Sequence, residues 1–337
     1  MSENTNTTKR RSAIQIMGSL IGLVKPLLHI MLAAIILGTL GYLCAIFLTI
    51  LAGQVIMHGL LTGVAGMIVP VDNMWRVFTP VKTIITVMIV IAVLRGILHY
   101  VEQYCNHFIA FKLLAIIRHK VFAALRKLCP AKLEGRDKGN LISIITTDIE
   151  LLEVFYAHTI SPIAIATLTS IIMVIFIGRY HWLAGVIALV AYLIVGVVIP
   201  MWNGKRGSQK GMEFRTNFGE LNSFVLDSLR GLDETIQYGQ GEKRKEQMSE
   251  HSKNLAGMQE SLSKMEGSQR SFTNMVILLA SFGMLALTIW LYDKGAMGFE
   301  GILTCTIAMM GSFGPVVALS SLSNNLNQTL ASGERVL

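Results

Sequence analysis

The fold is decided by residues 159–201, which read TISPIAIATLTSIIMVIFIG, then RYH, then WLAGVIALVAYLIVGVVIPM. Both apolar runs are uncharged, and a helix needs roughly 20 mainly apolar residues to cross the hydrocarbon core of a bilayer. Only Arg179, Tyr180 and His181 separate the runs, so the chain must turn back at once. This stretch therefore predicts a hairpin of two membrane-spanning helices.

Four further apolar stretches flank the predicted hairpin. They lie at residues 26–57, 83–98, 271–292 and 301–322, and Arg95 is their only charged residue. The 337-residue chain is 53% hydrophobic and 15% charged, whereas a soluble protein carries about 25% charged residues. We therefore predict an all-α membrane protein with six transmembrane helices rather than a soluble enzyme or a disordered chain.

The distribution of Lys and Arg predicts the orientation in the membrane. Residues 9–11 are basic and no cleavable apolar core follows them, and residues 99–158 hold eight Lys and Arg, against four in the predicted outer loops. Cytoplasmic loops carry the excess of positive charge. We therefore expect a protein of a bacterial-type inner or plasma membrane, with both termini on the cytoplasmic side. Residues 12–23 could form a short helix along the inner interface. The net charge of +8 forms no aromatic-interleaved patch that would indicate nucleic acid.

Two long inner excursions alternate with the short outer turns. Residues 202–270 hold eleven Lys and Arg and ten Asp and Glu, with apolar residues at helical spacing, which predicts two helical arms joined at a tip. The first excursion is helical in pattern from Arg95 to Leu128, and Pro130, Gly135 and Gly139 mark its turn. A solvated hairpin would explain the charges. It would not explain the length, which favours arms that dock against a partner.

The second span carries a polar face. Arg95, His99, Glu102 and Asn106 follow i, i+4, i+7, i+11 spacing, and Gln103 lies beside them. Buried charge in a membrane usually faces the bundle interior or a wet cavity, so these residues are candidates for a substrate path. Arg95 would contact a carboxylate and Glu102 an ammonium group. The alternative is that Arg95 and Glu102 pair with each other, or with neighbouring helices, and only hold the bundle together.

The sequence lacks the motifs of several kinds of chemistry. The four cysteines are far apart in the sequence and form no CxxC pair, so we predict neither a disulfide framework nor a metal site. No GxxxxGK[ST] phosphate loop occurs. We therefore predict no catalytic residues and no ATPase site in this chain.

Three segments resemble the membrane domain of an ABC exporter half-transporter. They are LCPAKLEGRDKGNLISIITTDIE at 128–150, LDSLRGLDETIQYG at 226–239 and ASGERVL at 331–337. The resemblance implies ATP and Mg²⁺ on a nucleotide-binding domain that this chain lacks, and a second half-transporter, identical or different, as partner. It divides the chain into a lead with an interfacial helix (1–24), a six-span domain (25–325) and a linker (326–337). It also implies that the two tips couple to the nucleotide-binding domains through Gly139, Asp148, Arg230, Gly231 and Asp233.

Within that family, residues 100–107 (YVEQYCNH) and 148–162 are most similar to the CydC type. This resemblance implies a heterodimer that exports cysteine or glutathione and binds haem at His107. One position departs from the pattern, because Gln103 stands where the CydC type has an arginine that pairs with a haem propionate. The alternatives are a multidrug or lipid exporter and, in a different class, a haem-binding electron-transfer subunit of the membrane.

Overall fold

The structure, a computed structural model, describes residues 25–63, 81–129 and 144–319 and a few single positions near the two ends. These residues form helices joined by short turns and contain no strand. Six of the helices are long and apolar enough to cross a membrane, which confirms the predicted all-α fold with six spans. Most of the predicted interfacial helix at 12–23 and the first tip, with Gly139, lie outside the described residues.

The helices follow one another along the chain with few interruptions. The short 3-10 turn η1 (Lys25–Leu27) leads into the first span. The α-helices are α2 (Leu28–Gly63), α3 (Val81–Leu128), α5 (Ile149–Phe155), α6 (Ser161–Gly178), α7 (Trp182–Leu193), α8 (Ile199–Arg230), α9 (Leu232–Gln237), α10 (Gly241–Asp293) and α11 (Phe299–Gly311). Three wider π-helical turns join some of them, namely η3 (Ile144–Asp148), η4 (Tyr156–Ile160) and η5 (Ile194–Val198).

The hairpin of α6 and α7 closes through the predicted three-residue turn. The His181 side chain caps α7, since its Nδ1 accepts a hydrogen bond from the backbone N–H of Leu183 at 3.2 Å. Two glycines next to the turn face each other, and a Cβ on Gly185 would lie 2.9 Å from the Cα of Gly178. The two backbones can approach this closely only because neither residue has a side chain, as small residues commonly allow between membrane helices.

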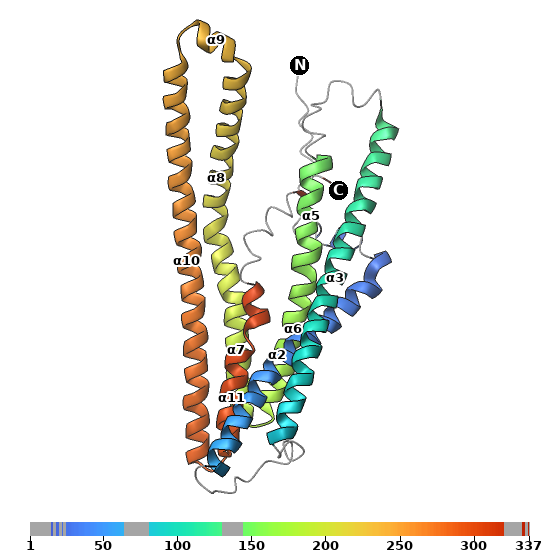
Figure 1. Ribbon diagram of the computed structural model, residues 1–337, viewed down its shortest axis with the longest axis vertical. Coiled ribbons are helices and arrows are strands. Elements are labelled where there is room, and N and C mark those ends of the chain that lie inside the picture. Colours follow the sequence, from blue (N-terminus) through green and yellow to red (C-terminus); the bar gives the residue numbers. More distant parts are fainter. Residues whose placement is uncertain are drawn as a thin grey trace, which may run out of the picture.

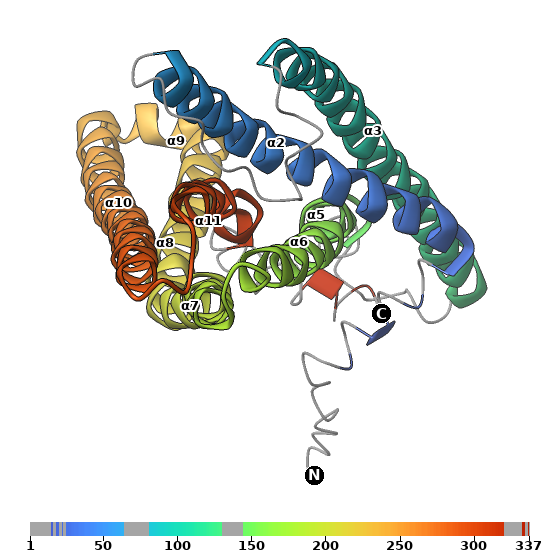
Figure 2. The ribbon, with the colours of Figure 1, turned by 90° about the horizontal axis from the view of Figure 1, so that it is seen from below.

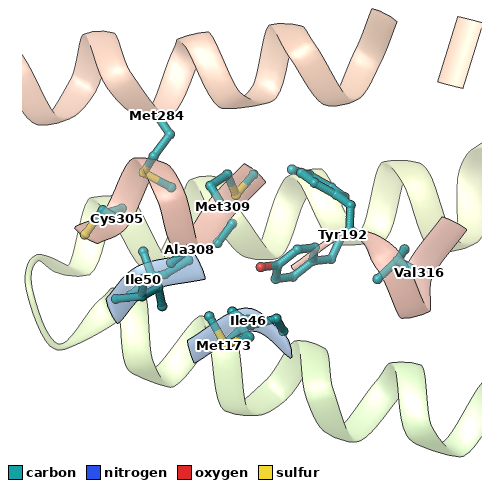
Figure 3. Packing of buried hydrophobic residues seen from close by; sticks show 14 of the residues in the cluster. Ile46, Ile50, Met173, Tyr192, Met284, Cys305, Ala308, Met309 and Val316 are labelled. Atoms are coloured by element: carbon teal, nitrogen blue, oxygen red, sulfur yellow. The ribbon is translucent and has the colours of Figure 1, made fainter. Parts of the chain in front are cut away.

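The main core lies where α2, α6, α7, α10 and α11 meet, with α11 surrounded by the others (Figure 2). Ile46 and Ile50 of α2 pack against Met173 of α6 and against Ala308 and Met309 of α11 (Figure 3). Helix α3 joins this bundle mainly through α2. Half of its apolar residues between Ile85 and Phe122 are exposed in the single chain.

Two arms extend from one end of the bundle and diverge (Figure 1). One is the pair α8 and α10 joined by α9, and the other is the upper part of α3 together with α5. Polar contacts link α8 to α10, because Lys210 Nζ donates to Ser261 Oγ at 3.2 Å and the Arg244 guanidinium lies 4.8 Å from the ring centre of Phe224. Helix α8 has 32 residues, which corresponds to a length of about 48 Å.

Candidate substrate path and coupling segments

The polar face of α3 has a buried part and an exposed part. Glu102 and Asn106 are buried with 4% and 3% of their surface exposed, whereas Arg95 and His99 are exposed. Leu98 and Ile109 share the buried side of the helix. The spacing correctly predicts that all four residues lie along one side of the helix. Only Glu102 and Asn106 are inside the protein.

Glu102 is the centre of a hydrogen-bonded group on α3. Asn106 Nδ2 donates to its Oε1 at 2.6 Å, and Gln103 Nε2 donates to its Oε2 at 3.2 Å. His99 Nδ1 lies 3.2 Å from the same Oε2. Buried carboxylates need such partners because an isolated charge in a low-dielectric setting is costly. Arg95 forms no ion pair with Glu102, and both residues belong to the described part of the chain.

His107 lies one turn beyond Gln103 on α3. Its ring stacks on Phe111 at a centroid distance of 6.1 Å, and its Nδ1 is 3.9 Å from Oε1 of Glu153 on α5. The side chain is 46% exposed. The Gln103 amide, on the same helix, is directed to Glu102.

The described part of the predicted first coupling segment contacts Ser332. Asp148, at the end of η3, is buried, and its Oδ1 accepts a hydrogen bond of 3.0 Å from Ser332 Oγ. Val336 packs against the neighbouring apolar cluster, in which Ile149 and Tyr156 are buried. Burial raises the pKa of the Tyr156 hydroxyl above its usual range. The described residues Ser332 and Val336 therefore contact η3 and the apolar cluster around α5 in the first arm.

The predicted second coupling segment, residues 226–239, forms the far end of the longer arm (Figure 1). Gly231 ends α8, its N–H donating to Asp227 O at 2.9 Å, and Asp233 lies in the first turn of the short helix α9. Arg230 and Asp233 are exposed. Large apolar side chains are exposed around them at Leu226, Leu229, Leu232, Ile236 and Tyr238.

Polar contacts between α2 and α11 were missed by the sequence analysis. Gln54 Nε2 donates to Thr304 Oγ1 at 2.8 Å and lies 3.5 Å from Oε1 of Glu300. All three residues are buried. The available signal was an amide inside an otherwise apolar run, and it was overlooked because Glu300 fell just before the predicted sixth span.

Tyr192 of α7 and Ser312, just after α11, form a second missed contact, a short hydrogen bond between their hydroxyl groups. Both hydroxyls are buried, and Ser312 Oγ also donates to Met309 O at 3.1 Å. Serine and tyrosine are ordinary residues in a membrane helix, so only the three-dimensional arrangement reveals this pair.

Six apolar helices with long paired extensions define a multi-pass membrane protein in which a helical bundle carries helical arms on one side. Residues 27–316 match the ABC transporter transmembrane region. The chain belongs to this family, whose members work with ATP-binding domains and a second membrane half.

Known relatives agree with this family and differ in what they carry. A probable ABC transporter ATP-binding/permease protein of Haemophilus influenzae is 41% identical over 331 residues, which cover 97% of this chain and 57% of the relative. The glutathione/L-cysteine transport system ATP-binding/permease protein CydC of the same organism is 21% identical, covering 73% of this chain and 43% of that protein. An ATP-dependent lipid A-core flippase of Escherichia coli is 25% identical, covering 71% and 40%. This chain thus spans about half the length of these relatives.

Proposed function

We propose that this chain is the membrane-spanning part of an ATP-driven exporter, with its arms and both termini in the cytoplasm. The observation that carries the proposal is the tip of the α8–α10 arm, where a six-residue helix is held at the end of two long helices. Exposed Leu232, Ile236 and Tyr238 give this tip an apolar surface suited to docking. Closure of two nucleotide-binding domains would move the tips, and the rigid arms would open the bundle to the outside.

The coupling role that we propose extends to both tips. Arg230, Gly231 and Asp233 shape or flank the second contact, and Gly139 and Asp148 belong to the first. The hydrogen bond from Ser332 to Asp148 supports this assignment, because it joins the first coupling segment to the linker. Movement of a domain attached to the linker would then reach the first arm directly.

For the cargo we propose a small thiol or amino-acid-like solute such as cysteine or glutathione, in a heterodimer with a second half-transporter. The candidate path includes Arg95, His99, Glu102, Gln103 and Asn106, a polar face that suits a small charged solute better than an apolar one. The name of the CydC relative supports the same class, at low identity.

A lipid exporter is the second candidate, and one feature of the fold favours it. An apolar cavity of about 260 Å³ opens between α6, α7, η5 and the segment that follows α11. Its walls include Val174, Leu189, Val197 and Val316, which suit an acyl chain. The flippase relative is as distant as the thiol exporter.

Haem is not part of the function that we propose. The Gln103 amide is directed to Glu102 rather than to the surface near His107, and it carries no positive charge for a propionate. His107 itself faces Glu153.

Transport into inside-out vesicles tests the proposal. Vesicles that contain this chain together with its ATP-binding region and partner should take up radiolabelled glutathione or cysteine only when ATP is supplied. Vesicles with a nucleotide analogue that is not hydrolysed are the control. ATP-dependent translocation of a fluorescent lipid, without uptake of either thiol, would contradict the proposed cargo and favour the second candidate.

A further inference from the structure

A small cavity opens between α2 and α3 beside the polar face. Its volume is about 190 Å³, larger than the roughly 150 Å³ engineered cavity that holds a benzene molecule. Its walls are formed by Gly38, Gly41, Tyr42 and Ala45 of α2 and by Arg95 and His99 of α3. The small residues of α2 leave the space, and the charged residue comes from α3.

Arg95 gives this cavity a positive charge. The guanidinium group forms no ion pair or hydrogen bond within residues 25–63, 81–129 and 144–319. A charged side chain in a membrane helix is costly unless it finds a partner or water. The planar guanidinium has five N–H donors and binds carboxylate or phosphate oxygens in pairs.

Glu102 does not line this cavity and forms no ion pair with Arg95, and both residues belong to the described part of the chain. Its carboxylate is buried beneath Gly38, where a Cβ would lie 3.0 Å from Cγ of Glu102. Asn106 and Gln103 donate to its two oxygens, and His99 Nδ1 contacts it as well. Glu102 is thus engaged with its own helix and fixes the His99 ring in the cavity wall, which leaves Arg95 as the ionic group that faces the space.

We propose that this cavity binds the carboxylate or phosphate group of the transported molecule, with Arg95 as the ionic contact. The inference rests on the proposed exporter function and narrows its cargo to molecules with an oxyanion group. Such a group can belong to a small soluble solute or to a lipid headgroup. A purely cationic cargo, or one without charge, does not suit the site.

Binding measurements on the full chain in phosphatidylcholine nanodiscs test the site. Glutathione is the soluble probe, followed by calorimetric titration, and phosphatidic acid added to the nanodiscs is the lipid probe, followed by native mass spectrometry. Arg95→Gln removes the charge, and we expect at least one probe to bind about tenfold to hundredfold more weakly, as for loss of a charged hydrogen-bonded pair. Arg179→Gln, in the outer turn, is the matched control and should bind both probes as the wild type does.

A second variant tests the space rather than the charge. Gly41→Ala places a methyl group 3.7 Å from Cβ of Leu98, an ordinary contact, so the fold should be retained while the cavity shrinks. We expect weaker binding of the probe that depends on Arg95. Gly96→Ala is its control, because a Cβ there meets nothing within 4 Å.

The outcomes separate the sources and the proposals. Arg95-dependent binding of glutathione alone identifies a soluble oxyanion, and Arg95-dependent binding of phosphatidic acid alone identifies a lipid headgroup; both support the site. Unchanged binding of both probes in Arg95→Gln, or no saturable binding of either, would overturn it. If the Arg95→Gln variant still transports at wild-type rates when ATP is supplied, the proposed oxyanion site is wrong. The proposed exporter function would still hold.

Discussion

Gln54 is the residue whose side chain links α2 to α11 inside the bundle. Its amide donates to Thr304 at 2.8 Å, and Gln54→Leu keeps the volume but removes this donor. We expect the free energy of unfolding to fall by about 1 kcal/mol. Interhelical hydrogen bonds in membranes average about 0.6 kcal/mol, and the buried Thr304 hydroxyl would also lose its hydrogen-bond partner. Unfolding by denaturing detergent, followed by tryptophan fluorescence, measures it.

The control for Gln54 is Thr86→Val on α3. Thr86 is exposed, and among the described residues its hydroxyl bonds only to the carbonyl of Lys82 in its own helix, so we expect a change within about 0.5 kcal/mol. Equal effects of the two variants would show that the contact between α2 and α11 does not stabilise the bundle.

His107 provides a second prediction for a single residue. We expect that haem added to the detergent-purified protein gives no saturable shift of the Soret band that depends on His107. The reason is that Gln103 supplies no cation for a propionate and is directed to Glu102. Wild type and His107→Ala should give the same titration, and a saturable shift that is lost in the variant would restore the CydC-type haem site.

Among the helices, the α6–α7 hairpin depends on two backbones in contact. A Cβ on Gly185 would lie 2.9 Å from Cα of Gly178 and 3.3 Å from Val174 O, and neither atom can move without moving a helix. We expect Gly185→Ala to lower the free energy of unfolding by about 1 to 3 kcal/mol, the usual cost of overpacking. Gly283→Ala on α10 is the control, since a Cβ there meets nothing within 4 Å, and it should leave the unfolding transition unchanged or raise it slightly. Indistinguishable transitions would contradict the close approach.

The tip helix α9 is expected to matter for function and not for stability. Ile236 is 68% exposed, so Ile236→Asp should leave the melting temperature unchanged while it places a charge on the proposed docking surface. We expect ATP-dependent transport to fall about tenfold or more, because an unpaired charge buried at an interface is costly. Gln259→Asp, on the exposed side of α10 along the arm, is the matched control. Normal transport by the Ile236 variant would exclude this surface from coupling.

For the whole molecule, the arrangement in the membrane is the first property to test. After replacement of Cys44, Cys105, Cys129 and Cys305, single cysteines are introduced at Gly231 in the tip and at Tyr180 in the short turn. A membrane-impermeant maleimide added to intact cells should label Tyr180→Cys and not Gly231→Cys, and inside-out vesicles should give the reverse. Labelling of the tip from outside intact cells would invert the orientation and contradict the coupling proposal.

Most of this architecture could be predicted from the sequence because lipid imposes simple rules. Uncharged runs such as 159–178 and 182–201 are long enough to span the membrane. Residues 202–270 are charged and poor in turn residues, with apolar residues at helical spacing, which predicts helices. The site was less predictable. The i, i+4 pattern placed Arg95 and Glu102 on one side of α3, yet it gave no sign that Glu102 is engaged by its own helix while Arg95 faces a cavity made by glycines of α2. That division depends on how two helices pack, and spacing within one helix does not contain it.

The π-helical turn η5 lies at the base of the longer arm, between α7 and α8. π-helical turns inside α-helices are rare and are found frequently at functional sites. Mechanically, η5 can serve as a fulcrum and α8 as the lever above it. A tilt of about 10° about this point would carry the tip sideways by about 8 Å over a length of about 48 Å. A tilt of about 10° inside the membrane would thus become a displacement of about 8 Å at the tip, without bending the helix between them.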